Sequence, residues 1–275
     1  MKKIYLLIIG AVGVIVIFIL AIFSSKKPSG PGEVLKPSVS EKADQAFLAG
    51  QLKEAKELYE KNLENLTDPA AINDIRKKIE TIKMKFLFSS EPDACSSVYT
   101  VQPKDTLTKI SKTHNTTIEL IKRSNNLASD TIVPGQNLKV MTCEFSLVID
   151  KSQNLLFLKQ GSEAIKTYQV STGKDNSTPT GDFVIDNNKL KNPTWFKTGA
   201  VIAPDSPENI LGSRWMGLEG VDSGGESIKG YGIHGTTEPE KLGQQVTLGC
   251  VRMNNADVEE LYDVIPTGAK VTILD

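Results

Sequence analysis

Residues Ile4–Phe23 form a run of 20 residues without a charged side chain, directly after Lys2 and Lys3. As a single α-helix, a run of this length spans about 30 Å, the hydrocarbon thickness of a bilayer. The alternative is a cleaved signal peptide, which has a shorter apolar region and small residues at its cleavage site. The exit Ala21–Lys27 lacks that pattern. The sequence therefore predicts an uncleaved membrane anchor over residues 1–27, with the rest of the chain outside the cytoplasm.

The counts of charged residues, histidines and cysteines limit the chemistry of the chain. It has 32 Lys+Arg against 33 Asp+Glu, a formal net charge of -1. This balance argues against a nucleic-acid-binding protein, which carries a basic surface. Three Cys and two His are too few for a four-Cys zinc site or a His-rich metal centre. We therefore expect no metal, no cofactor and no nucleic-acid partner, and any catalytic imidazole has to belong to His114 or His234.

Two segments with different compositions follow the apolar run. Residues 28–40 are rich in Pro and Gly, as in a linker. Residues 41–90 carry apolar side chains at three- and four-residue steps, which indicates amphipathic helices, with a break at Gly50 and a new helix start at Asp68 and Pro69. The stretch AFLAGQLKEAKELYEKNLE resembles one tetratricopeptide unit with a following helix. Two interpretations stay open for this segment: a structural spacer, or a module that binds a protein partner.

Residues 97–142 predict a strand at each end and two short helices between them, with Thr106 and Thr116 as N-caps. The pattern resembles a LysM module in five motifs: Tyr99-Thr100-Val101, Asp105-Thr106-Leu107, Ile110-Ser111, Asn126-Leu127 and Pro134-Gly135-Gln136-Asn137-Leu138. The resemblance implies a βααβ fold that binds glycan containing N-acetylglucosamine, usually peptidoglycan. It also implies that the glycan-binding groove is lined by Lys104, Asp105, Thr106, Leu127 and Ile132. The alternative is a LysM fold that serves only as a spacer.

Cys95 and Cys143 flank this module. If its first and last strands pair in antiparallel fashion, the residues just outside them come close together, so a disulfide between these two cysteines is geometrically reasonable. Exported proteins commonly use paired cysteines in this way. The pairing leaves Cys250 as the free thiol, and two independent buried thiols are the alternative.

Residues 144–275 are expected to form one mainly-β domain. Runs of β-branched and aromatic residues alternate with Gly, Asn, Pro and Asp turns, and one helix is expected over Ala256–Ile265. Trp195 and Trp215 either line a substrate cleft or belong to the core.

Cys250 and His234 are the candidates for chemistry in this domain. A nucleophilic thiol needs a base that holds it as the thiolate, and donors for the oxyanion that forms on attack. Gly249 lets the backbone turn sharply just before the thiol. From the residues alone, a buried structural cysteine remains an alternative, and metal ligation is disfavoured because further His or Cys ligands are lacking.

The region from about Glu144 to Asp275 resembles a YkuD-like L,D-transpeptidase catalytic domain. The matching motifs are Ser171-Thr172-Gly173, Thr178-Pro179-Thr180-Gly181-Asp182-Phe183, Asn209-Ile210-Leu211-Gly212, Gly232-Ile233-His234-Gly235-Thr236 and Gly249-Cys250-Val251-Arg252-Met253. The resemblance implies that Cys250 is the acylated nucleophile and His234 its base, acting as a thiolate–imidazolium pair.

The resemblance also assigns the residues around this pair. Gly249, Cys250 and Val251 supply backbone donors, and Arg252 orders the site or meets a substrate carboxylate. Gly235, Thr236 and Thr247 complete the site by the same resemblance. Thr247 stands where the family usually has Ser, and Leu248 where many members have a second His.

The implied reaction is acyl transfer on peptidoglycan without a metal. Cys250 attacks the third residue of a tetrapeptide stem, D-Ala leaves, and an amine of a neighbouring stem takes the acyl group. Water or an amine on a wall-linked protein are alternative acceptors, and a non-catalytic wall-binding scaffold is the competing class. The expected fold class is therefore multidomain. It comprises an N-terminal transmembrane helix (1–27), a linker (28–40), an α-helical, tetratricopeptide-like spacer (41–90), a βααβ LysM module (97–142) and a mainly-β L,D-transpeptidase domain (144–275), in the periplasm or cell wall.

Overall fold

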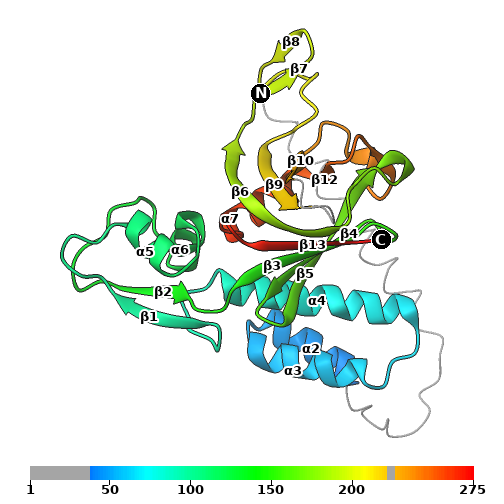
Figure 1. The fold of residues 1–275 in the computed structure, drawn as a ribbon. Helices are drawn as coiled ribbons and strands as arrows, with labels where there is room; N and C mark the ends of the chain where they lie inside the picture. The colour runs from blue at the N-terminus through cyan, green and yellow to red at the C-terminus, as the bar shows by residue number, and fades with distance from the viewer. Residues whose placement is uncertain (1–37, 222–226) are drawn as a thin grey trace, which may run out of the picture.

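The computed structural model of the protein describes residues 38–221 and 227–275 (Figure 1). The expected membrane anchor over residues 1–27 and nearly all of the linker lie outside these residues. Within the described ranges, no helix combines the length and the apolar character that a membrane span requires.

Three helices open the described chain: α2 (Val39–Leu48), α3 (Leu52–Leu63) and α4 (Pro69–Leu87). Ser38 and Glu41 form a capping box at the start of α2, and Asp68 caps α4, with Pro69 as its first residue. Gly50, at φ +76°, makes the turn between α2 and α3. The helices bury a small core of their own, made by Ala43, Ala46, Ala55, Tyr59, Ile75, Ile79 and Ile82.

The next module has the expected βααβ order: β1 (Ser96–Thr100), α5 (Leu107–Thr113), α6 (Ile118–Ser124) and β2 (Asn137–Met141). β1 and β2 pair in antiparallel fashion, and Cys95 and Cys143, just beyond their paired ends, form a disulfide. Thr106 caps α5 as expected. The N-cap of α6 is Thr117 rather than Thr116, because the Thr117 hydroxyl is the one that accepts from the N–H of Leu120.

The remaining residues build the sheet of the mainly-β domain. Its strands are β3 (Phe145–Asp150), β4 (Leu155–Gln160), β5 (Glu163–Gly173), β6 (Gly181–Lys191), β9 (Arg214–Val221), β10 (Ser227–His234), β11 (Gln245–Thr247), β12 (Val251–Met253) and β13 (Lys270–Leu274). They run in the order β11-β5-β12-β10-β9-β6-β13-β3-β4, and β4 also pairs with β5, which closes the sheet on itself with β11 outside the ring. A small hairpin, β7 (Trp195–Lys197) and β8 (Ala200–Ile202), projects from it (Figure 1).

One helix, α7 (Asn255–Val264), follows β12 and packs on β9 and β10. Asn254 caps it, and the helix begins at Asn255, one position before the predicted start at Ala256. Since α7 begins directly after β12, its N-terminus lies beside the strand ends that carry the candidate catalytic residues.

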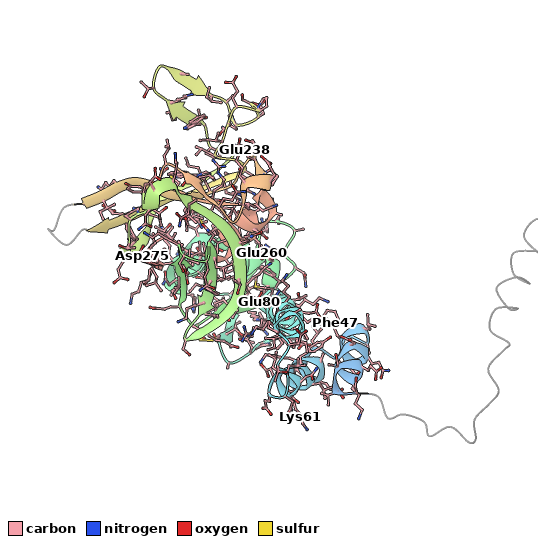
Figure 2. All side chains as sticks on the ribbon, turned by 90° about the vertical axis from the view of Figure 1, so that its right-hand side faces the viewer. Phe47, Lys61, Glu80, Glu238, Glu260 and Asp275 are labelled. Carbon is pink, nitrogen blue, oxygen red and sulfur yellow. A yellow bond between two sulfur atoms is a disulfide. The ribbon has the colours of Figure 1, made fainter. Side chains whose placement is uncertain are left out.

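Residues from all three modules meet in one hydrophobic cluster. Met84 and Leu87 of α4, Leu120 of α6 and Met141 of β2 belong to the same buried cluster as the interior of the β domain. Polar contacts join the parts as well: Thr167 of β5 donates to Glu80 of α4 at 2.7 Å. Figure 2 labels Glu80 and shows the helices of residues 39–87 beside the β domain. The LysM-like module and the helices are therefore packed against the β domain.

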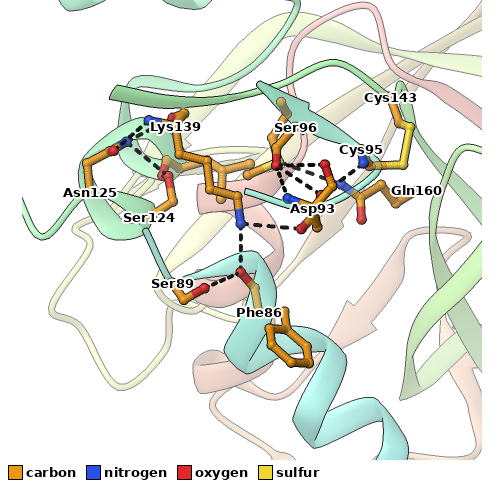
Figure 3. A network of polar contacts seen from close by, with 12 residues as sticks. Phe86, Ser89, Asp93, Cys95, Ser96, Ser124, Asn125, Lys139, Cys143 and Gln160 are labelled. Carbon is orange, nitrogen blue, oxygen red and sulfur yellow. Dashed lines mark hydrogen bonds and ion pairs between the residues drawn. A yellow bond between two sulfur atoms is a disulfide. The ribbon is translucent and has the colours of Figure 1, made fainter. Parts of the chain in front are cut away.

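A second set of contacts links the LysM-like module to its neighbours. The Lys139 ammonium, buried in the structure, lies 2.8 Å from the carbonyl oxygen of Phe86 and 3.3 Å from the Asp93 carboxylate (Figure 3). On the other side, Arg123 pairs with Asp263 of α7 at 2.9 Å. These contacts hold the module on both the α4 helix and the β domain.

Candidate active site

His234 and Cys250 come together because β10 and β12 lie side by side and parallel. Their register pairs Ile233 with Val251 and His234 with Arg252. Ile233 and Val251 are fully buried in the core. Because side chains alternate along a strand, His234 and Arg252 lie on the opposite face, and Cys250, two residues before Arg252, lies at the start of that face.

The His234 side chain is buried and precisely oriented. Only 3% of the residue is exposed, and its Nδ1 lies 2.7 Å from the carbonyl oxygen of Gly235. The ring stacks on that of Trp215, with centroids 5.8 Å apart and planes 20° apart. Burial lowers the pKa of His234 to about 4, and the positive charge of Arg252 acts in the same direction against the Gly235 hydrogen bond. His234 is therefore neutral at neutral pH.

Cys250 is the free cysteine among the described residues, and it is partly exposed. Burial raises the pKa of its thiol, while a hydrogen bond with the Gly232 backbone and the charge of Arg252 act to lower it. Both shifts favour uncharged groups, so the resting state is a neutral thiol on the same face of the sheet as a neutral imidazole. This differs from the thiolate–imidazolium pair that the resemblance implies, because the burial of His234 disfavours its charged form.

The Thr247 hydroxyl bridges the turn before Cys250. Thr247 donates to the carbonyl oxygen of Cys250 at 2.6 Å and accepts from the N–H of Gly249 at 3.1 Å. Gly249 has φ +128°, and a Cβ there would meet the ring of Tyr231 at 2.4 Å. The Gly249 N–H, expected as an oxyanion donor, is thus already engaged by Thr247. The neighbouring Leu248 is 96% exposed and faces solvent.

Arg252 is buried, with 6% exposure, and donates to the Glu238 carboxylate at 3.1 Å. Glu238 also accepts from Lys241, and these two cations lower the pKa of the Glu238 carboxyl group. The Nε atom of Arg252 has no partner among the described residues. Arg252 therefore brings a positive charge and a free N–H donor close to the Cys250–His234 pair.

Asn255 organises the loop after His234, a role that its sequence position next to the helix cap did not suggest. Its Oδ1 accepts from the N–H groups of Ser213 and Thr236 at 3.1 Å each, and its Nδ2 donates to the Thr236 carbonyl oxygen at 2.9 Å. A Cβ on Gly235 would lie 2.1 Å from this Oδ1, and one on Gly212 would lie 2.2 Å from it. Glycine at both positions is what allows the close approach.

A pocket of about 720 Å³ adjoins the loop after His234. It lies between the β7–β8 hairpin and the segment that carries Thr237 and Glu238, and its lining includes Trp195, Lys197 and Glu208. Trp195 thus lines a cleft, whereas Trp215 covers His234. The pocket presents one basic and two acidic side chains.

The expected glycan-binding residues of the LysM-like module are unequal in exposure. Lys104 and Thr106 are exposed, although the Thr106 hydroxyl caps α5. The Asp105 carboxylate is 1% exposed and accepts from Tyr99, Gln102 and Lys109. Leu127 and Ile132 are partly buried against the core of the module.

The other histidine, His114, ends α5 and packs edge-on against Tyr99, far along the chain from Cys250. Among the described residues, no group of three or more His, Cys, Asp or Glu side chains is placed to hold a metal ion.

Comparison with known proteins identifies two regions of the chain. Residues 144–273 match the YkuD model, described as the L,D-transpeptidase catalytic domain, and residues 99–140 match the LysM domain. The putative L,D-transpeptidase YqjB of Bacillus subtilis is 38% identical over 130 residues, which cover 47% of this chain and 70% of YqjB. The putative L,D-transpeptidase YkuD of Bacillus licheniformis is 29% identical over 184 residues, which cover 64% of this chain and 98% of that protein.

Solved structures of similar proteins include the catalytic domain of an L,D-transpeptidase from E. faecium, at 19% identity and a TM-score of 0.37. The match covers 48% of this chain and 97% of that domain. A second, an L,D-transpeptidase from Mycobacterium smegmatis, has 18% identity and a TM-score of 0.36, with 52% of this chain and 65% of that chain covered. Because these scores are low, the assignment rests on the sequence matches.

The chain belongs to the YkuD family of L,D-transpeptidases, and a LysM domain precedes its catalytic domain. It is an acyltransferase of peptidoglycan cross-linking, and its two domains indicate a location in the cell wall or envelope.

Proposed function

We propose that the protein cross-links peptidoglycan stems through a thioester on Cys250, with His234 as the base. The observation that carries this proposal is the pairing of β10 with β12, which puts Cys250 and His234 on one face, together with the Nδ1 contact to Gly235. A carbonyl oxygen accepts only, so Nδ1 holds the proton and Nε2 is left to receive one. A neutral imidazole next to a thiol is the arrangement required for general-base activation.

The acylation step follows from this arrangement. As the Cys250 sulfur bonds to the carbonyl carbon of the third stem residue, its proton moves to Nε2 of His234. The amide bond to D-Ala then breaks, and the same proton goes to the leaving amine. In the second step the amine of a neighbouring stem attacks the thioester, the C–S bond breaks, and the amine's proton returns to the thiol through His234. The product is a cross-link between two third residues.

The groups around the pair have separate roles in this proposal. The backbone N–H groups of Cys250 and Val251 face the oxyanion, while Thr247 and Gly249 hold the turn that presents them. Gly235 and Thr236 hold the His234 loop. Arg252 supplies positive charge near a substrate carboxylate, supported by its unpartnered Nε.

We also propose that the pocket beside Glu238 receives the peptide stem. Peptide stems carry both carboxylates and amines, and the pocket offers Lys197 for the first and Glu208 and Glu238 for the second. Thr237 and Glu238, in the segment that follows His234, are part of its lining, which supports this placement.

The remaining parts of the chain would hold the catalytic domain near its substrate. In this proposal residues 1–27 anchor the protein in the membrane, residues 28–40 link the anchor to the helical spacer at 41–90, and the LysM module at 97–142 grips glycan. Lys104 and the exposed edges of the loops around Leu127 and Ile132 would make the glycan contacts. The spacer either sets the distance from the membrane or binds a protein partner.

The test is incubation of residues 38–275 with purified tetrapeptide muropeptides, read by mass spectrometry. Cross-linked dimers with release of D-Ala are the expected products, and the Cys250→Ala variant should yield none. Tripeptides without dimers would indicate a carboxypeptidase, which uses water as the acceptor. Dimers or tripeptides formed by Cys250→Ala would exclude the proposed nucleophile, and unchanged tetrapeptide with the unmodified protein would favour a non-catalytic scaffold.

A further inference from the structure

The hydroxyl of Thr178 joins two loops of the active site. Thr178 follows the short helix η1 (Lys174–Asn176), and only 1% of the residue is exposed. Its Oγ1 accepts a hydrogen bond from the N–H of Gly173 at 2.7 Å and donates one to the carbonyl oxygen of Gly249 at 2.9 Å. An N–H only donates and a carbonyl oxygen only accepts, so the direction of the hydroxyl proton is settled.

The bond to Gly249 sets the direction of a second group, the N–H of Cys250. These two groups belong to one peptide unit, and in a trans peptide the C=O and the N–H point in opposite directions. The described residues contain no cis peptide bond. Holding the Gly249 oxygen against Thr178 therefore turns the Cys250 N–H away from Thr178.

Three other polar backbone groups of this turn are occupied. Thr247 takes the N–H of Gly249 and the carbonyl oxygen of Cys250, and Thr178 takes the carbonyl oxygen of Gly249. Among the turn and side-chain hydrogen bonds between described residues, none uses the Cys250 N–H. A donor held in one direction beside the nucleophile is what a developing oxyanion needs.

The surroundings keep Thr178 itself in place. Lys151, which is buried, donates to the Thr178 carbonyl oxygen at 2.9 Å and pairs with the Asp275 carboxylate at 2.9 Å. A Cβ on Gly173 would lie 3.0 Å from the Gly249 Cα, so glycine at this position lets the two loops approach.

We propose that Thr178 is a positioning residue for acyl transfer: through the Gly249 carbonyl it orients the Cys250 N–H as an oxyanion donor. The inference rests on the proposed role of Cys250 as the acylated nucleophile. This role differs from that of a residue that activates the thiol, because neither hydrogen bond of the Thr178 hydroxyl reaches Cys250 Sγ or His234.

The test compares two reactions of the Cys250 thiol in the wild type, Thr178→Val and Thr178→Ser, using residues 38–275. Acylation by a carbapenem forms an oxyanion, whereas alkylation by iodoacetamide does not. In Thr178→Val the acylation rate should fall about 10- to 100-fold while the alkylation rate stays unchanged. Thr178→Ser retains the hydroxyl and should recover most of the acylation rate. Intact-mass time courses give both rates.

Thr172→Val is the matched control, because Thr172 is also 1% exposed but donates to Asn154 instead. It should acylate like the wild type. Wild-type acylation in Thr178→Val, or equal losses of acylation and alkylation, would overturn the inference. Should Thr178→Val not fold by circular dichroism, Thr178→Ser decides: a tenfold or greater loss of acylation at an unchanged melting temperature would overturn it. A wild-type protein that is alkylated but never acylated would instead reject the proposed function, and the inference with it.

Discussion

The Nδ1 atom of His234 lies 2.7 Å from the carbonyl oxygen of Gly235, the next residue in the chain. This contact defines the neutral tautomer, with the proton on Nδ1 and the lone pair on Nε2. Asn255 holds the following peptide through Thr236, so the carbonyl is part of a braced loop. A backbone oxygen thus orients the base. Because the imidazole of His234 is neutral at rest, it needs no buried carboxylate beside it.

This arrangement predicts an unusual pH profile for acylation of Cys250. The base works only when neutral, and burial lowers the pKa of His234 to about 4. The acylation rate should therefore stay near its neutral-pH value down to about pH 5 and fall as the pH approaches 4. A histidine of ordinary pKa would be about nine-tenths protonated at pH 5.5. Stopped-flow acylation by a carbapenem over pH 4 to 8 measures the profile, and a midpoint near 6.5 would contradict it.

The lowered pKa of His234 also predicts that the folded protein is less stable in acid. The unfolded chain binds a proton on this histidine below about pH 6.5, but the folded protein does so only near pH 4. The free energy of unfolding should therefore decrease between these values, by about 2.5 kcal/mol from pH 7 to pH 4.5 for this group alone. Urea unfolding of wild type and His234→Gln at both pH values isolates the contribution, which should be absent from the variant.

Substitutions of the two candidate catalytic residues should have different effects on acylation. His234→Ala should slow acylation by about 10²-fold or more, because the thiol loses its base. Cys250→Ala should form no adduct at all, since Cys95 and Cys143 are joined in the disulfide. Intact-mass measurement over time distinguishes the two results. Acylation of His234→Ala at the wild-type rate would remove His234 as the base.

The disulfide predicts one reactive thiol in the exported protein, that of Cys250. Cys95 and Cys143 are 48 residues apart, and closing a loop of this size contributes about 4 kcal/mol to stability in the chain-entropy model. Thiol counting in denaturant without reductant should return one, and reduction should lower the midpoint of urea unfolding. A count of three would show that the bridge does not form.

Local patterns made much of the architecture predictable. Asp68 and Pro69 marked the start of α4, and Thr106 that of α5, because caps and first-turn residues act over three or four positions. The βααβ order and the mainly-β domain followed from periodicity and turn residues in the same way. The N-cap of α6 was misplaced by one residue, since Thr116 and Thr117 carry the same side chain.

What the sequence could not supply depends on contacts between distant segments. The role of Asn255 comes from three bonds to residues 19 to 42 positions away. The pKa of His234 depends on its burial under Trp215, which no local pattern encodes. Likewise Asp105 was expected to bind glycan, but its carboxylate is used inside the module by Tyr99 and Lys109.

The proposed anchor predicts that the full-length chain is found in the membrane fraction with its original N-terminus. The long apolar run Ile4–Phe23 has no cleavage pattern at its exit, which is the reason for this expectation. N-terminal sequencing of protein purified from membranes measures it. A mature N-terminus between Phe23 and Pro31 would reject the anchor in favour of a cleaved signal.

Because the Lys139 ammonium is buried, replacing Asp93 and replacing Lys139 should change the free energy of unfolding by different amounts. Its side chain is 0% exposed, whereas the Asp93 carboxylate is 35% exposed and able to reach water. Asp93→Asn removes the negative charge and leaves the buried ammonium with neutral acceptors only, so it should destabilise the protein by about 2 kcal/mol. Lys139→Met removes the charge itself and should cost less. The double variant should be more stable than Asp93→Asn alone, because no unpaired buried charge remains. Urea unfolding of the four proteins at pH 7 tests this order, and a Lys139→Met variant less stable than Asp93→Asn would contradict it.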